Sequence, residues 1–214
     1  CALEFIDHAC IEMIRDYAQT DLPRDAGAML LIEVDGLASQ IETGVGAVEA
    51  AARGPGLIEL RTARDKQETE ALWASRKALS PALRKIAPKK INEDIAVPVS
   101  RMAELIDGLQ DVSRRHGITN VNFGHAGNGN IHVNLLIDPD NTEQMKQAGP
   151  CLHEVFTLVL SLDGTLSGEH GVGLEKRPFM SLEFDSVQLD LMRRIKQQFD
   201  PRNLLNPGKL LPSD

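Results

Sequence analysis

The spacing of apolar residues along the chain predicts short strands that alternate with amphipathic helices. Apolar residues recur every three or four positions between Leu3 and Gln19, which predicts a first helix. Short apolar runs bounded by turn residues predict strands over 28–34, 57–61, 91–97, 120–125 and 131–137. Longer stretches with helical periodicity predict helices over 38–52, 65–80, 100–116, 142–161, 174–180 and 187–199.

This order of elements predicts an α+β fold built on an antiparallel sheet. Strands alternate with helices at first, and two strands then meet in a hairpin, which favours a split β-α-β arrangement. We therefore expect a ferredoxin-like sheet with helices on one face within residues 1–165. A C-terminal helical segment, residues 166–214, should follow it.

Composition narrows the class of protein. The chain has 214 residues, of which 42% are hydrophobic and 25% charged, and these values are typical of a soluble globular protein. A formal net charge of -8 argues against nucleic-acid binding, and no apolar run reaches the ~20 residues of a membrane span. The three cysteines match no metal-binding spacing, which is typical of reduced thiols in a cytoplasmic protein. The absence of a membrane-spanning run does not conflict with peripheral attachment of the full-length enzyme to a membrane.

The segment from Gly124 to Leu136 holds the first candidate chemistry. Asn128-Gly129 is a strong signal for a two-residue hairpin turn, and such a turn would place His125 opposite His132. Opposed residues lie close together on one face, so two imidazoles could share a metal ion there. A cross-strand pair of histidines can also be a plain polar pair, and a one-residue slip would separate the rings across the sheet.

A second candidate lies in the glycine-rich stretch from Ser167 to Gly173. Glu169 could give a carboxylate oxygen to a metal, and His170 could act as a base beside it. Two histidines and a carboxylate with open positions suit zinc or another divalent first-row ion. The alternative is a glycine loop whose polar side chains are simply solvated.

Five segments together resemble a known family. They are LWASRKAL (72–79), EDIAVPVSRM (93–102), GHAGNGNIHVNLL (124–136), SGEHGVGLEKRPFM (167–180) and DPRNLLNPGKLLP (200–212). In this order they resemble the C-terminal domain of FAD-linked oxidases of the vanillyl-alcohol oxidase type. The likeness covers essentially the whole chain and is nearest to the D-lactate, D-2-hydroxyglutarate and glycolate dehydrogenases.

The resemblance implies a role for particular residues. His125, His132 and Glu169 match the ligands of a divalent metal, zinc or manganese. His170 matches the general base of the reaction.

The same resemblance implies residues that contact the substrate and the flavin. Arg76 matches an arginine that grips the substrate carboxylate, with Ser80 assisting it, and Asn134 matches an amide on the substrate side. Asn206 lies in a tail that returns to the flavin in such enzymes.

These roles imply FAD-dependent oxidation of a 2-hydroxy acid to a 2-keto acid. Asn92 stands near the place where the D-2-hydroxyglutarate enzymes have a substrate-binding lysine, which favours a monocarboxylate such as lactate or glycolate. No glycine-rich phosphate loop occurs in the sequence. We therefore expect FAD to be held mostly by an N-terminal domain or a separate flavin subunit, with a further partner as electron acceptor. The chain alone should be inactive.

Two other functions fit the residues without the resemblance. The His, His and Glu set could form a hydrolytic zinc site in which His170 activates water. A metal-free interaction domain would need none of this chemistry and would not respond to hydroxy acids.

Overall fold

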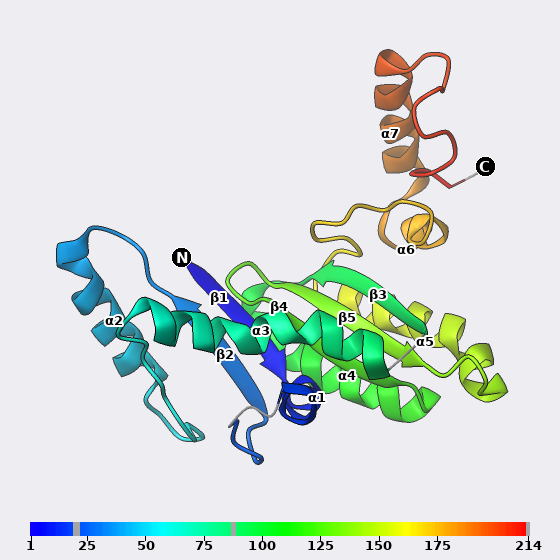
Figure 1. The fold of residues 1–214 in the computed structure, drawn as a ribbon. Coiled ribbons are helices and arrows are strands. Elements are labelled where there is room, and N and C mark those ends of the chain that lie inside the picture. The colour runs from blue at the N-terminus through cyan, green and yellow to red at the C-terminus, as the bar shows by residue number, and fades with distance from the viewer. Residues whose placement is uncertain (19–21, 87–88, 213–214) are drawn as a thin grey trace.

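The computed structural model describes residues 1–18, 22–86 and 89–212, apart from the side chains at 16, 18, 80 and 84–86. Within these residues, five strands form an antiparallel sheet in the order β2-β1-β4-β5-β3 (Figure 1). The strands are β1 (Ala2–Asp7), β2 (Ala28–Glu33), β3 (Lys89–Ala96), β4 (Thr119–His125) and β5 (Asn130–Ile137). The helices are α1 (His8–Ala18), α2 (Ala38–Ala52), α3 (Lys66–Ile86), α4 (Met102–His116), α5 (Thr142–Ser161), α6 (Met180–Glu183) and α7 (Ser186–Phe199). Short 3-10 turns cover Val99–Arg101 and Arg177–Phe179.

The α+β class and the antiparallel sheet are confirmed. Strands β3 and β4 both pair antiparallel with β5, so they run parallel to each other on its two sides. Helix α4 connects them, which is the split β-α-β arrangement that the element order predicts. A left-handed glycine ends α4, because Gly117 has a φ of 62°.

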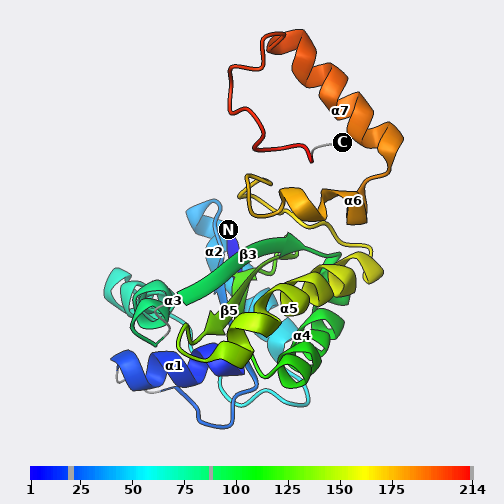
Figure 2. The ribbon, with the colours of Figure 1, turned by 90° about the vertical axis from the view of Figure 1, so that its right-hand side faces the viewer.

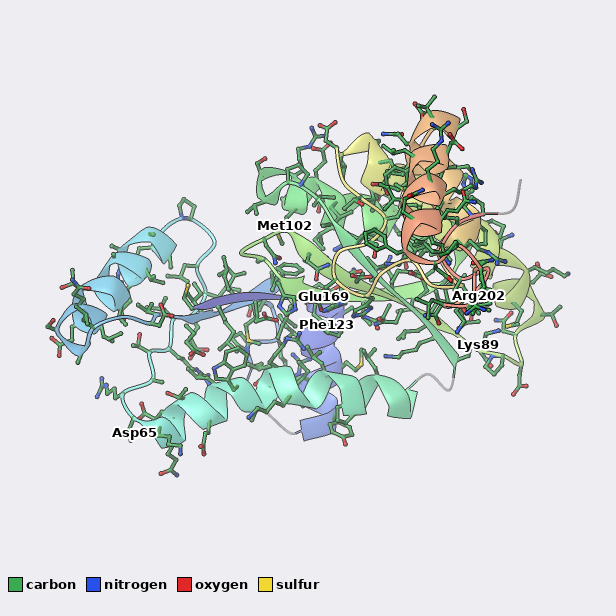
Figure 3. All side chains as sticks on the ribbon, turned by 90° about the horizontal axis from the view of Figure 1, so that it is seen from above. Asp65, Lys89, Met102, Phe123, Glu169 and Arg202 are labelled. Atoms are coloured by element: carbon green, nitrogen blue, oxygen red, sulfur yellow. The ribbon has the colours of Figure 1, made fainter. Side chains whose placement is uncertain are left out.

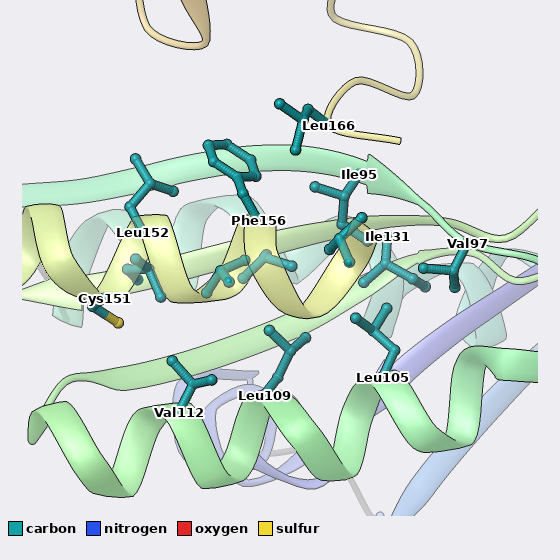
Figure 4. Packing of buried hydrophobic residues seen from close by; sticks show 14 of the residues in the cluster. Ile95, Val97, Leu105, Leu109, Val112, Ile131, Cys151, Leu152, Phe156 and Leu166 are labelled. Carbon is teal, nitrogen blue, oxygen red and sulfur yellow. The ribbon is translucent and has the colours of Figure 1, made fainter. Parts of the chain in front are cut away.

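Helices cover both faces of the sheet, so the expectation of helices on one face is incomplete. Ile131 and Val133 of β5 belong to the larger apolar core, together with residues of α4 and α5. Figure 4 shows Ile131 in this core, on the same side of the sheet as Leu105 of α4. Val121 and Phe123 of β4 belong to a second core with residues of α1 and α3. Figure 2 shows these two helix pairs on opposite sides of the sheet. The second helix layer exists because strands β1 and β4 also carry apolar side chains on the face opposite α4 and α5, and these must be buried.

The first predicted helix is wrong over its first turn and a half. Residues 2–7 form β1, which lies between β2 and β4, and the helix begins only at His8. The apolar residues of this segment are also spaced as in a helix, but hydrogen bonding to β2 and β4 on both sides stabilises the strand instead. Asp7 then marks the change, because its carboxylate accepts a hydrogen bond from the Cys10 N–H at 2.8 Å. The predicted end at Gln19 lies outside the described residues.

Two further predictions need correction. Residues 57–61 have no regular secondary structure and are exposed, and no described strand pairs with them, so the predicted strand is wrong. Residues 174–180 form no continuous helix, because a 3-10 turn at Arg177–Phe179 leads into the short α6. After α6, helix α7 and the tail stand away from the sheet (Figures 1 and 2).

Phe156 of α5 is fully buried in the larger core, where it packs against Phe179 with ring centroids 4.8 Å apart. We expect Phe156→Ala to lower the free energy of unfolding by about 3–5 kcal/mol, because it leaves a cavity that the core cannot fill. Urea titration measures this. The control is Phe199→Ala, whose ring is 84% exposed and whose loss should cost under about 0.5 kcal/mol. Equal losses in the two variants would contradict the assignment of the core.

Candidate metal and substrate site

The β4–β5 hairpin places both candidate histidines on one face of the sheet. The turn is longer than predicted, so His125 pairs with Asn130 and His132 pairs with Phe123. The predicted pairing of His125 with His132 is therefore wrong. Both rings nevertheless project from the same face, because the shift along β5 is two residues and side chains alternate with a period of two. Their ring centroids lie 5.4 Å apart.

The loop after Thr165 brings Glu169 over this hairpin. Thr165 pairs with Ala96 at the edge of the sheet, and the Gly168 N–H donates to the Asp94 carbonyl at 3.2 Å. A Cβ atom at Gly168 would lie 1.8 Å from Nδ2 of Asn130, so only glycine allows the loop to approach this closely.

His125, His132 and Glu169 form a candidate metal site. Oε1 of Glu169 lies 3.6 Å from Nε2 of His125 and 3.7 Å from Nε2 of His132. One ligand atom from each residue falls within 4.8 Å of the other two. Metal bonds to such ligands are about 2.0–2.2 Å long, so a single ion can bridge atoms that are about 4 Å apart. The donor set and its spacing therefore fit a divalent first-row ion.

His132 is suited to act as a neutral ligand. Burial lowers the pKa of His132, and the neighbouring His125 and His170 lower it further. A metal binds the unprotonated imidazole nitrogen, so a depressed pKa keeps this ligand available as the pH falls.

His170 stacks on His132 at the edge of this cluster. Their ring centroids are 5.2 Å apart and their planes are inclined by 17°. Nδ1 of His170 faces Oδ1 of Asp94 at 3.6 Å, while Nε2 faces Oε1 of Glu169 at 3.8 Å. The Nε2 atom is thus directed toward the candidate metal site.

Asp94 anchors the loop that carries Glu169 and His170, a role that sequence reasoning did not assign to it. Its side chain is fully buried and accepts hydrogen bonds from the backbone N–H groups of Glu169 and His170, the latter at 2.8 Å. It also forms an ion pair with the buried Lys176. Burial tends to raise the pKa of Asp94, but these hydrogen bonds from Lys176 and the two N–H groups hold it below its usual range.

Glu4 is a second residue that sequence reasoning missed. It lies on β1 directly opposite His125, and its Oε1 accepts a hydrogen bond from Nδ1 of His125. Its Oε2 accepts from Nε of Arg76 at 2.8 Å. Arg76 also lies over the ring of Phe123, with its guanidinium carbon 4.6 Å from the ring centroid. The structure therefore brings Arg76, on α3, to the candidate metal site. In Figure 3, the labels of Phe123 and Glu169 mark this region of the molecule.

The other predicted residues lie elsewhere or outside the description. Asn134 follows His132 on the same face but is fully buried, and its amide bonds to Asn92 and to the Val121 carbonyl. The side chain of Ser80 is outside the described part of the chain. Asn206 lies in the tail beside α7, where its side chain accepts from Lys209 at 3.2 Å, and it is not part of the metal cluster.

The motifs and the fold point to a class of domains found in FAD-linked oxidases. The family described as "FAD linked oxidases, C-terminal domain" matches residues 1–210, so the chain belongs to this family, as its motifs predict.

Several curated relatives are named as an oxidase of glycolate or as dehydrogenases of D-lactate and D-2-hydroxyglutarate. The chain is 36% identical to the glycolate oxidase subunit GlcD of Bacillus subtilis over 212 residues, which is 99% of the chain and 45% of that protein. It is 30% identical to the probable mitochondrial D-lactate dehydrogenase of Danio rerio, over 98% of the chain and 42% of that protein. It is 26% identical to the mitochondrial D-2-hydroxyglutarate dehydrogenase of Rattus norvegicus, over 99% and 39%. The chain thus spans less than half the length of these relatives.

Solved structures support the same fold. A 4-ethylphenol oxidase from Gulosibacter chungangensis superposes with a TM-score of 0.61 at 15% identity, over 99% of this chain and 48% of that one. A p-cresol methylhydroxylase superposes with a TM-score of 0.56 at 15% identity, over 97% and 46%. Among the described residues, no helix has the length and apolar character needed to cross a membrane. A cytoplasmic location stays a prediction.

Glu93, beside Asp94, generates a pH-dependent prediction. Burial raises the pKa of Glu93 to about 7, against the attraction of Lys176, whose Nζ lies 3.7 Å from Oε2. The folded protein therefore favours protonated Glu93, and this stability is fully present below pH 4.5 and lost as the pH rises through about 7. Between about pH 5 and 8, wild type should lose roughly 2–3 kcal/mol of unfolding free energy relative to Glu93→Gln.

Urea titrations of both proteins across this pH range measure the difference. The exposed Glu70→Gln variant is the control and should follow wild type at every pH. A difference between wild type and Glu93→Gln that does not change with pH would rule out a raised pKa for Glu93.

Proposed function

We propose that this chain forms the substrate side of an FAD-dependent enzyme that oxidises a small 2-hydroxy acid to a 2-keto acid. The observation that carries this is the convergence of His125, His132 and Glu169 beside Arg76 and His170. Membership of the FAD-linked oxidase family favours this function over a zinc hydrolase or a binding domain. The relatives named for glycolate and D-lactate support a monocarboxylate, glycolate or D-lactate, as substrate.

The proposed metal ligands are His125, His132 and Glu169, for zinc or manganese. When bound, a divalent ion supplies Lewis acidity that lowers the pKa of a hydroxyl group, and FAD supplies the two-electron acceptor. Arg76 would bind the substrate carboxylate through its guanidinium group, with Ser80 assisting it. Asn134 is fully buried and bonded to Asn92 and to the Val121 carbonyl, so we propose no direct substrate contact for it.

Nε2 of His170 would take the hydroxyl proton. Its other ring nitrogen faces Asp94, a buried carboxylate that favours a proton on Nδ1 and leaves Nε2 free to accept one. The substrate would lose the hydroxyl proton to His170 and a hydride from C2, for which FAD would be the acceptor, and this would leave a 2-keto acid.

A flavin domain is the proposed partner of the C-terminal segment, with a further electron acceptor downstream. One face of α7 exposes apolar side chains at four-residue intervals, at Val187, Leu191, Ile195 and Phe199. The tail adds exposed leucines at 204 and 205, before Asn206. An exposed apolar stripe of this kind is typical of a surface that another domain covers. We propose that residues 166–214 return to the flavin domain there, with Asn206 near the flavin.

Metal content tests the metal site. Wild-type chain loaded with zinc or manganese should hold about one divalent ion per chain by mass spectrometry, whereas His132→Ala should hold almost none. The control is His153→Ala, an exposed histidine on α5, which should bind like wild type. Equal metal content in the His132 and His153 variants would exclude this site.

Steady-state kinetics of the chain joined to its flavin domain test the two substrate-side roles. Arg76→Lys should raise KM for glycolate or D-lactate, because a lysine cannot make the bidentate pair of an arginine with a carboxylate. His170→Gln should lower kcat by about 10²–10⁴-fold, the usual contribution of a general base. A His170→Gln enzyme with unchanged kcat would refute the base assignment.

A further inference from the structure

We propose that Glu4 is a positioning residue that holds the metal ligand His125 and the substrate anchor Arg76 in fixed orientations at the same time. The inference rests on the proposed function, because it assigns Glu4 a task toward the proposed metal and substrate. It adds a residue of β1 that neither the sequence motifs nor the ligand set includes.

The backbone places Glu4 for this task. Glu4 and His125 are directly paired residues of two antiparallel strands, and such pairs have Cβ atoms about 4.5–5.5 Å apart on one face. The Glu4 side chain is 7% exposed, so its charge needs partners. Within the described part of the chain it has two, and each uses a different oxygen: His125 bonds to Oε1 and Arg76 to Oε2.

The contact with Oε1 decides which nitrogen of His125 can bind a metal. A carboxylate only accepts hydrogen bonds, so Nδ1 of His125 carries the proton in this pair. Nε2 is then the nitrogen with a free lone pair, and it is the atom that lies 3.6 Å from Oε1 of Glu169. Metal-binding histidines commonly donate their second N–H to a carboxylate in this way, which orients the ring and strengthens the ligand.

The contact with Oε2 orients Arg76. Because Glu4 engages Nε and Phe123 supports the guanidinium plane, the edge formed by the two Nη atoms is the one offered to a substrate carboxylate. Glu4 therefore ties the metal ligand and the substrate anchor to a single side chain.

Glutamine cannot replace Glu4 in this role. Both partners of Glu4 are donors, and a carboxylate can accept from both, whereas a side-chain amide has one acceptor oxygen and one donor nitrogen. In Glu4→Gln, the NH2 group must face either His125 or Arg76. His125 would then accept at Nδ1 and carry its proton on Nε2, or Arg76 would lose its partner and His125 would keep only a neutral amide oxygen in place of the carboxylate.

The first experiment is a titration of zinc into the chain, followed calorimetrically. We expect Glu4→Gln to bind zinc about 10–100-fold more weakly than wild type, the usual cost of losing a carboxylate partner of a metal-binding histidine. Glu33→Gln is the matched control, because it makes the same change at an exposed position of the neighbouring strand β2, and its affinity should equal that of wild type. Equal affinities of wild type and Glu4→Gln would overturn the inference.

A second experiment needs no variant and so does not depend on whether Glu4→Gln folds. Long-range ¹H–¹⁵N NMR spectra of the zinc-loaded wild type identify which nitrogen of each histidine holds the proton. We expect His125 to be protonated at Nδ1 and bound to zinc through Nε2, with a slowly exchanging Nδ1 proton. Binding through Nδ1 would overturn the inference even with the metal in place. Failure of wild type to bind zinc or manganese at all would instead overturn the proposed function, and the role of Glu4 with it.

Discussion

The register of the antiparallel sheet is the constraint on which the site depends. Three neighbouring strands contribute Glu4, His125 and His132, and these side chains meet only because each occupies a position of the same parity in its strand. The next strand, β3, continues the row with Asp94 opposite His132. A slip of one residue between any two of these strands would move part of the cluster to the opposite face, where α4 and α5 cover the apolar core.

Two buried carboxylates position the site residues that do not lie on the sheet. Asp94 fixes the glycine-rich loop through two backbone N–H groups and is neutralised by Lys176. Glu4 fixes a helix residue, Arg76, and a strand residue, His125. Each buried charge would cost several kcal/mol if left alone, so each must be paired, and the pairing determines the geometry of the site. The close approach of the loop further requires that position 168 has no side chain.

Much of the fold could be predicted from the sequence, because its signals are local. The helices at 38–52 and 142–161 match the periodicity of the sequence, and Gly117 ends helix α4, which is a common position for glycine. The predictions fail where the spacing of apolar residues fits both a helix and a strand. Residues 3–7 fit a helix and a strand equally well, and only pairing with β2 and β4 decides between them. Residues 57–61 pair with none of the described strands, so they do not form the predicted strand.

The sequence by itself determined the family and the hairpin, and its resemblance to that family supplied three candidate ligands, because each of these depends on short motifs that are read along the chain. Parity kept His125 and His132 on one face even though their predicted pairing was wrong by two residues. Only the tertiary structure showed that Glu4 and Asp94 belong to the same site, because they lie far from the hairpin in sequence. Their contacts arise because β1 pairs with β4 and β3 pairs with β5. A local sequence pattern does not predict which distant strand a segment will pair with.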